Sequence, residues 1–320
     1  MSSLAVPGVL MGHASGDATG VTVVLCPEGA VAGVDARGGA TGTRELDPCL
    51  PGHLVPRVHG ICLAGGSAFG LAAAGGAMRW LEEHGLGFPT RAGVVPIVPG
   101  AILYDLALGD PRIRPDEAMG YAACEAAGPG LPERGSVGAA RGASVGKLFG
   151  KAHATKGGLG AASRREGDLV VTAIAAVNAF GDVIDPATGK IIAGARKPEG
   201  GFADSAACMA TGTAPGGFTV PAAEAPDPAT TLVVLATNAT LNRSGASRMA
   251  AAGSLGVART ITPVHTRFDG DIVFALATGE IEASAEQLGV LAAELTAQAI
   301  LDGILQATSV DGVPAASELA

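Results

Sequence analysis

Short runs of β-branched and aliphatic residues, each bounded by glycine or another turn residue, constrain the fold of this chain most. Five of these runs are predicted to be strands, at residues 21–26, 31–35, 169–178, 231–237 and 271–278. Helical patterns separate the strands, at residues 67–84, 115–127, 247–255 and 284–305. Because strands and helices follow one another in mixed order, we expect an α/β or α+β fold.

The composition is that of a folded enzyme with an unusually tight core. Of the 320 residues 48% are hydrophobic, but only 3% are aromatic and 49 are glycine, so the core must be built from Ala, Val, Leu and Ile at close approach. The formal net charge is −9, and the Lys and Arg residues are scattered along the chain. Nucleic acid is therefore not an expected partner, since no basic patch is available for a phosphate backbone.

The cysteines and the N-terminus indicate the compartment. An odd number of cysteines without CxxC spacing argues against a disulfide framework and favours reduced core residues: Cys26, Cys49, Cys62, Cys124 and Cys208. The N-terminal segment lacks a basic stretch followed by an apolar run, and no uncharged stretch of about 18 strongly apolar residues is bounded as a membrane span would be. We expect a cytoplasmic protein with no membrane partner.

A compositional break falls at residues 196–229, which are rich in Gly, Pro and Ala and show neither helical nor strand periodicity. Loops longer than about 15 residues are uncommon inside compact domains and tend to be functional or to act as linkers. This predicted loop leads directly into the strand whose first residues are Thr230 and Thr231.

Several motifs for cofactors or metals fail on inspection. The Gly-rich run at residues 135–150 has Arg141 in place of a glycine and Leu148 after Lys147, so it lacks the hydroxyl that a phosphate loop needs for magnesium. The run at residues 157–163 is better explained as a turn. The histidines are far apart in sequence and form no metal-ligand pair, so we predict neither cofactor nor metal.

Taken alone, the remaining polar candidates favour ordinary structural roles. His265 is interpreted as a structural residue at a strand edge, and Ser67 as a helix cap, because Phe69 stands where a nucleophile elbow would need glycine. The segment Asp269-Gly270-Asp271 could bring two carboxylates together, although a solvated turn is the simpler interpretation. These patterns alone do not reach a reaction.

Seven segments, in their order and spacing, resemble the family of L-aminopeptidase/D-esterases, which also contains the β-peptide aminopeptidases and the nylon-oligomer endohydrolases. The resemblance covers most of the chain. The segments are VDARGGATGTRELDP (34–48), ICLAGGSAFGL (61–71), ILYDL (102–106), GASVGK (142–147), VNAFGDVID (177–185), TTLVVLATN (230–238) and VHTRFDGDIVFALATGE (264–280).

The resemblance implies a four-layer α-β-β-α sandwich of the aminopeptidase/ornithine-acetyltransferase type, made as one precursor. It implies cleavage just before a Thr or Ser at the start of a strand, which is the Ala229–Thr230 bond here. Residues 1–320 would then be one hydrolase domain, cut into an α-chain of residues 1–229 and a β-chain of residues 230–320. Self-cleavage would explain the long loop, because this segment must enter the site in a strained conformation before cleavage and leave it afterwards.

The resemblance also assigns roles, with Thr230 as the nucleophile. A threonine hydroxyl needs a base within hydrogen-bond reach, and a freed α-amine with an unperturbed pKa near 7.7–8.0 is such a base. By similarity Asp269 and Asp271 lie beside the nucleophile, and Lys147 biases the amine towards its neutral form. Asn178 and Tyr104 match positions that donate hydrogen bonds close to the reacting carbonyl, where an oxyanion develops.

The combination of Thr230 with the separate segment Asp269-Gly270-Asp271 is closest in motif to the nylon-oligomer branch. This indicates amide substrates with an ω-amino or another non-standard acyl part, or small peptides with a free amine. Ala229 departs from the Asn or Gly that often precedes the cut in the family. An uncleaved binding or scaffolding protein of the same fold is therefore one alternative, and transfer of the acyl group to an amine is another. The resemblance implies a homotetramer of cleaved αβ units.

Overall fold

The computed structural model describes residues 5–212 and 227–319, and a sheet of ten strands lies at the centre of these residues. Eight strands follow the order β11-β12-β15-β17-β2-β4-β7-β3, and β1 pairs with both β2 and β8. Their bounds are Leu10–Ser15 (β1), Gly20–Ala36 (β2), Thr43–Arg44 (β3), Val58–Ala64 (β4), Gly100–Ile102 (β7), Gly128–Pro129 (β8), Leu159–Glu166 (β11), Leu169–Asn178 (β12), Thr230–Ala239 (β15) and Ile272–Ile281 (β17).

Strand β2 joins the two halves of this sheet. Residues 31–36 pair antiparallel with β17, and residues 21–25 pair antiparallel with β4. The two strands predicted at 21–26 and 31–35 are thus wrong as separate elements. The register of the pairing shifts between Leu25 and Ala30, and an irregularity of this kind bends a strand where the sequence indicated a turn.

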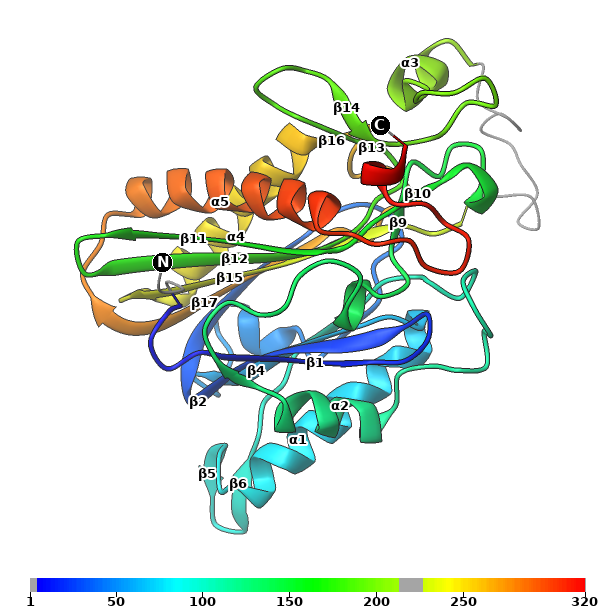
Figure 1. The fold of residues 1–320 in the computed structure, drawn as a ribbon. Coiled ribbons are helices and arrows are strands. Elements are labelled where there is room, and N and C mark those ends of the chain that lie inside the picture. Colours follow the sequence, from blue (N-terminus) through cyan, green and yellow to red (C-terminus); the bar gives the residue numbers. More distant parts are fainter. Residues whose placement is uncertain (1–4, 213–226, 320) are drawn as a thin grey trace.

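The bend folds the sheet into two layers, and helices cover both outer faces (Figure 1). Helices α4 (Arg243–Thr260) and α5 (Ala285–Leu305) pack on the layer of β11, β12, β15 and β17, whereas α1 (Ala73–Glu83) and α2 (Glu117–Glu125) pack on the layer of β1, β2 and β4. The predicted four-layer α-β-β-α sandwich is confirmed.

Successive side chains of β15 pack into two different hydrophobic cores, one on each face of its sheet layer. Leu232 and Val234 belong to the core between the two sheet layers, which also contains Leu63 of β4. Val233 and Leu235 belong to the separate core beneath α4 and α5. Because side chains alternate across a strand, a strand buried on both faces is a continuous apolar run, as TTLVVLATN is.

The helices correct the sequence predictions at their ends. In the predicted helix 67–84, residues Ser67–Ala72 form a 3₁₀ helix, and the capping position is Gly66 in a left-handed conformation, so the interpretation of Ser67 as a cap was wrong. Helix α4 is longer than predicted, because the Asn242 side chain caps it by accepting from Gly245 N. Helix α5 begins as predicted, since Ser284 accepts from Gln287 N.

Helix α5 is long and apolar enough to cross a membrane by length and composition, but 61% of its apolar window is buried inside the protein. It is therefore explained by its place in the core. Four of the cysteines are buried free thiols, as predicted for core residues, and Cys208 is half-buried: Cys26, Cys49, Cys62 and Cys124 are the buried ones.

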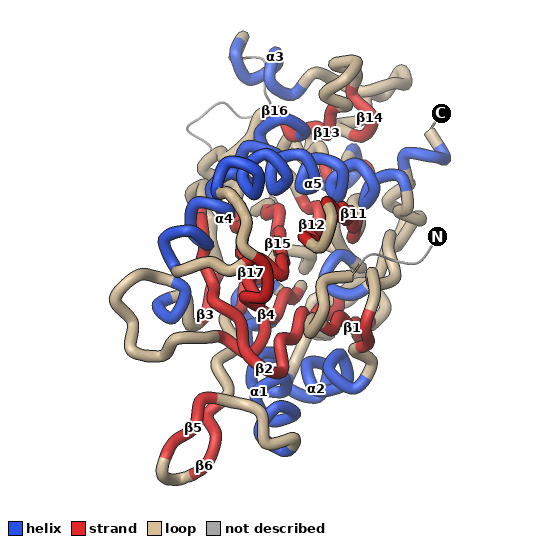
Figure 2. The backbone as a smooth tube through the Cα atoms, turned by 90° about the vertical axis from the view of Figure 1, so that its left-hand side faces the viewer, coloured by secondary structure: helices blue, strands red, loops and turns tan. Residues whose placement is uncertain are grey.

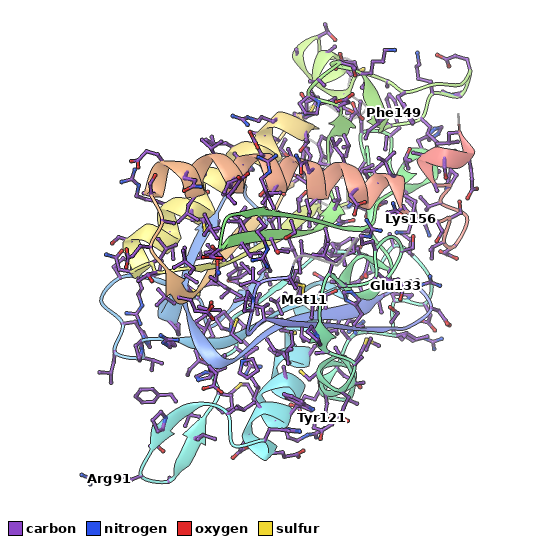
Figure 3. The ribbon with its side chains drawn as sticks, turned by 60° about the vertical axis from the view of Figure 1, so that its left-hand side comes forward. Met11, Arg91, Tyr121, Glu133, Phe149 and Lys156 are labelled. Atoms are coloured by element: carbon purple, nitrogen blue, oxygen red, sulfur yellow. The ribbon has the colours of Figure 1, made fainter. Side chains whose placement is uncertain are left out.

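Smaller elements surround one end of the sandwich and one edge. The pair β9 (Ser144–Val145) and β10 (Thr155–Lys156) and the group β13 (Asp182–Ile184), β14 (Ile191–Ala193) and β16 (Ile261–Thr262) lie at the end where β15 begins. A hairpin of β5 (Phe88–Thr90) and β6 (Gly93–Val95) projects from the body, as Figure 2 shows, and Figure 3 places Arg91 at its tip.

The predicted loop 196–229 contains a short helix, α3 (Ser205–Ala210), so the prediction of no regular structure was wrong there. Asp204 caps this helix by accepting from Ala207 N, a local signal that lies within an otherwise irregular composition. Residues 213–226 of the predicted loop lie outside the described residues.

Candidate active site

The predicted nucleophile is the first residue of β15 and lies between the end of β12 and the start of β17. Thr230 pairs with Asn178, the last residue of β12, and β17 runs parallel to β15 on the other side. Thr230 is only 2% exposed and Asn178 is fully buried. The strand order thus brings together residues that are about fifty positions apart in sequence.

Ala229 is held like a further residue of the strand. Its N–H donates to Phe268 O at 2.8 Å, and its carbonyl accepts from Gly270 N–H at 2.8 Å. The Thr230 hydroxyl donates to the same carbonyl at 2.5 Å. The carbonyl of the predicted cleavage bond is therefore contacted at once by the predicted nucleophile and by a backbone N–H donor.

Gly270 is essential to this arrangement for steric reasons. A Cβ atom at position 270 would lie 2.4 Å from Ala40 O and 3.0 Å from Thr230 Oγ1. Any side chain there would push the backbone of residue 270 away from Thr230. The sequence patterns drew attention to the two aspartates and gave no role to the glycine between them.

Both aspartates are buried and both are already engaged. Asp269 accepts from Phe180 N at 3.1 Å through one carboxylate oxygen, and from Thr266 N and Thr266 Oγ1 at 2.9 and 2.7 Å through the other. Asp271 accepts from Thr231 N at 2.7 Å. With 1% and 3% exposure these carboxylates do not form the solvated turn that was the simpler interpretation.

His265 completes this side of the site. Its Nδ1 lies 2.9 Å from the second carboxylate oxygen of Asp271, and its backbone has a positive φ of 52°. It lies in the turn between β16 and β17, so the prediction of a strand-edge residue was wrong. Among residues 5–212 and 227–319, neither aspartate carboxylate hydrogen-bonds to Thr230 Oγ1.

Lys147 and Asn178 form the opposite side of the site. The Lys147 ammonium donates to Asn178 Oδ1 at 2.9 Å, to Asn178 O at 3.2 Å and to Pro228 O at 3.2 Å. The Asn178 side chain also accepts from Ser144 N at 3.0 Å and donates to Tyr104 O at 3.0 Å. Tyr104 therefore reaches this cluster through its backbone carbonyl.

Burial shifts the titration of these groups. It lowers the pKa of Lys147 to about 8, against the opposing effect of Asp227, Asp269, Asp105 and Asp271. Burial, followed by the charge of Asp271, raises the pKa of Asp269. Burial and the charges of Asp227 and Asp105 raise the pKa of Tyr104. A buried ammonium with three acceptors remains a good donor near neutral pH, because each N–H has a partner.

A second buried lysine was missed in the sequence. Lys156 is fully buried, and its ammonium donates to Ala140 O, Ala143 O and Gly157 O at 3.1, 2.7 and 2.8 Å. Burial lowers its pKa to about 7. It supports the segment that carries Ser144 and Lys147, since β10 pairs with β9 there. Figure 3 labels it.

The described residues contain no group of three or more His, Cys, Asp or Glu side chains placed to hold a metal ion. A cavity of about 10 Å³ lies beside Tyr104, Lys147 and Asp227. The chemistry that this arrangement supports is attack of a hydroxyl on an amide carbonyl, with backbone and ammonium donors around the reacting bond.

Comparisons with known proteins identify the family of this chain. Residues 4–317 match the model of peptidase family S58. An uncharacterised aminopeptidase of Mycobacterium tuberculosis is 42% identical over 97% of this chain and 95% of its own length. A 6-aminohexanoate-oligomer endohydrolase of Paenarthrobacter ureafaciens is 33% identical over 92% of this chain and 84% of its own.

Solved structures share the fold. An L-aminopeptidase D-Ala-esterase/amidase from Ochrobactrum anthropi superposes with a TM-score of 0.69 at 20% identity, covering 96% of this chain and 87% of that one. The PH0078 protein of Pyrococcus horikoshii superposes with a TM-score of 0.69 at 22% identity, covering 98% and 91%.

Proposed function

The chain belongs to peptidase family S58, whose members are aminopeptidases and related amide hydrolases, and we propose that it cuts itself at Ala229–Thr230 and then hydrolyses amides with Thr230. The observation that carries this proposal is the Ala229 carbonyl, which accepts from the Thr230 hydroxyl and from Gly270 N–H.

Self-cleavage proceeds by attack of Thr230 Oγ1 on the Ala229 carbonyl carbon. A bond forms between that oxygen and the carbon, the carbon–nitrogen bond breaks, and the hydroxyl proton is transferred to the departing amine. Gly270 N–H stabilises the negative charge that develops on the Ala229 oxygen. Water then hydrolyses the resulting ester, which releases the Ala229 carboxylate and the free hydroxyl and α-amine of Thr230.

In the mature enzyme the freed α-amine removes the proton from Thr230 Oγ1, and the hydroxyl attacks the carbonyl of an external amide. An ester forms between Thr230 Oγ1 and the acyl carbon, the carbon–nitrogen bond of the amide breaks, and the leaving amine takes the proton from the α-ammonium. Water then hydrolyses the ester, which releases the acid and the free hydroxyl. Lys147, held by Asn178, keeps a positive charge near the amine and favours its neutral form.

The substrates that we propose are ω-amino-acid oligoamides and small peptides. The 6-aminohexanoate-oligomer endohydrolases support the first, and the aminopeptidases at 42% identity support the second. The homotetramer and the cytoplasmic location stay predictions.

The test is hydrolysis of a 6-aminohexanoate oligomer and of small peptide amides by the wild type, by Thr230→Ser and by Thr230→Ala. We expect activity in the first two proteins and none in the third. Equal activity in Thr230→Ala would contradict the proposal. Product analysis with an added amine distinguishes hydrolysis from acyl transfer, because transfer yields a new amide in place of the acid.

A further inference from the structure

The position of Ala229 shows where the acyl part of a substrate binds, if Thr230 is the nucleophile of both reactions. The same hydroxyl must meet a carbonyl carbon in the same place, whether that carbonyl belongs to the chain itself or to a substrate. The contacts that Ala229 makes are therefore available to a substrate once the cut has been made, an inference that rests on the proposed function.

Two backbone groups hold Ala229 as a strand residue. Phe268 O accepts from its N–H, and Gly270 N–H donates to its carbonyl, each at 2.8 Å. Ala229 and Asp269 form a parallel bridge. A substrate whose acyl residue has a nitrogen on its α-carbon reproduces both bonds, since such a residue has the donor and the acceptor at this spacing.

The Ala229 side chain lies in an apolar pocket. It is completely buried and packs in one cluster with Leu148, Phe180, Ala195 and Ala203. Phe268 packs against this cluster, with its ring centroid 5.1 Å from that of Phe180. We refer to Leu148, Phe180, Ala195, Ala203 and Phe268 as the Ala229 pocket.

Three residues of the Ala229 pocket, Phe180, Ala195 and Ala203, are held by hydrogen bonds that do not involve Ala229 or Thr230. Phe180 follows β12, and its N–H is held by Asp269 at 3.1 Å. The buried Asp182 accepts from Ala195 N at 2.9 Å and from Ser205 N at 2.7 Å, while Ala203 N donates to Ala195 O at 2.7 Å. These bonds link the walls to each other and to the end of the sandwich where β15 begins.

From these contacts we infer that the Ala229 pocket is the subsite for the acyl side chain of the small peptides proposed above as substrates, and that among these peptides it selects α-aminoacyl amides with a small apolar side chain. A glycyl substrate would leave empty the space that the methyl group of Ala229 occupies. A leucine side chain exceeds the room that a fully buried alanine occupies. A carboxylate would be buried there without a partner.

The probes are the p-nitroanilides of glycine, alanine, leucine and aspartate, each with a free and with an acetylated amine. We expect kcat/KM for alanine to exceed that for glycine about fourfold, the equivalent of ~0.8 kcal/mol for one buried carbon group. Leucine should fall about tenfold or more below alanine. Aspartate should fall more than about a hundredfold below alanine.

The determinants are tested by trimming the pocket. Phe180→Leu should raise the leucine-to-alanine ratio of kcat/KM at least about tenfold, because it removes part of one wall. Phe274→Leu is the matched control, since Phe274 is equally buried but lies in the core between the sheet layers. Leu148→Ala is a second pocket variant for the case that Phe180→Leu does not fold.

Self-cleavage provides a parallel readout without any added substrate. Ala229→Leu and Ala229→Asp should slow the cut in the wild-type background, and Phe180→Leu should restore it for Ala229→Leu only. The same rank order in self-cleavage and turnover supports one shared pocket.

Three results would overturn the inference: an unchanged leucine-to-alanine ratio in both pocket variants, aspartate turned over as fast as alanine, or no anilide turned over by a chain that has cut itself. The last result would leave the proposed function intact, whereas activity that survives Thr230→Ala would overturn the proposed function.

Discussion

The two strands beside Thr230 bring opposite chemistry to it. On the β12 side lies an amide flank, Asn178 with Lys147, and on the β17 side lies an acidic flank, Asp269-Gly270-Asp271. The amide flank contacts the segment that precedes the predicted cleavage bond through a side-chain ammonium, which donates to Pro228 O. The acidic flank reaches the Ala229 carbonyl with a backbone N–H, that of Gly270.

The difference shows what each kind of residue is for. The carboxylates of the acidic flank are occupied by Phe180, Thr266, Thr231 and His265, so they fix the shape of the backbone. The lysine of the amide flank contacts the segment before the predicted cleavage bond directly, because its ammonium donates to Pro228 O. On the acidic flank, substitutions that move the backbone should therefore slow self-cleavage more than substitutions that remove a side chain.

The largest effect is expected for Gly270→Ala. The new Cβ would lie 2.4 Å from Ala40 O, so the backbone that donates to Ala229 must move. A displacement of about 1 Å at a reacting centre costs roughly a hundredfold in rate, and we expect at least this loss of self-cleavage. A time course on a denaturing gel measures it.

The matched control is Gly128→Ala, whose new Cβ would have no atom within 4 Å. It should cut itself at the wild-type rate. Normal cleavage in Gly270→Ala would mean that the Gly270 donor has no part in the reaction.

Removal of the ammonium on the amide flank is the next largest effect. Lys147→Met loses three hydrogen bonds from a charged donor, one of them to Pro228 O. Hydrogen bonds to charged groups contribute about 1.5–3 kcal/mol each, so loss of the Pro228 bond alone predicts self-cleavage slower by roughly ten- to a hundredfold. The same gel assay measures this rate, and an unchanged rate would exclude a direct role.

The pH dependence sharpens the assignment of Lys147. Its pKa of about 8 means that it is charged below that pH and loses a donor above it. Self-cleavage should therefore decline as the pH rises through about 8. Lys147→Arg should cut more slowly but should not show this decline, because a guanidinium stays charged. A rate that continues to rise between pH 8 and 9.5 in the wild type would contradict the role of the charge.

On the acidic flank Asp269→Asn should cost more stability than Asp271→Asn. Asp269 accepts three hydrogen bonds through both oxygens, so an amide NH₂ must face a buried donor, at a cost of about 1–3 kcal/mol. In Asp271→Asn the new amide could still accept from Thr231 N and donate to the His265 ring, which has an acceptor tautomer. Urea unfolding of both variants in the Thr230→Ala background measures the loss in free energy of unfolding. A larger loss in Asp271→Asn than in Asp269→Asn would contradict this prediction.

The smallest effect is expected for Tyr104→Phe. Tyr104 supports Asn178 through its backbone carbonyl, which this substitution keeps. Self-cleavage should stay within about twofold of the wild-type rate, whereas loss of a direct oxyanion donor costs about a hundredfold or more. A hundredfold loss of turnover with normal self-cleavage would place the hydroxyl in the mature site only.

Local signals in the sequence explain which parts of the fold could be predicted. The strand that begins at Thr230 and the Ser284 cap of α5 are set by neighbouring residues, and both were correct within one or two positions. Strand β2 was split because Pro27-Glu28-Gly29 has the composition of a turn, although the chain continues through an irregular pairing. Pairing partners decide that outcome, and they lie far away in the sequence.

In the site, too, local sequence signals do not show which distant residues come together. Family resemblance, and no local pattern, indicated that Lys147, Asn178, Thr230 and Asp269 meet. The Gly270 N–H was missed because a backbone donor leaves no signature in a sequence. Lys156 was missed because a lysine is seldom fully buried, and only the fold shows the three carbonyls around its ammonium.

The most direct test of the account is the intact mass, under denaturing conditions, of the purified wild type and of Thr230→Ala. The account predicts two chains in the wild type, of about 22 and about 9 kDa when 31.2 kDa is divided by residue number, with the smaller chain beginning at Thr230. It predicts one chain in Thr230→Ala. A single 31.2 kDa chain in both proteins would contradict self-cleavage and favour an uncleaved binding protein of this fold.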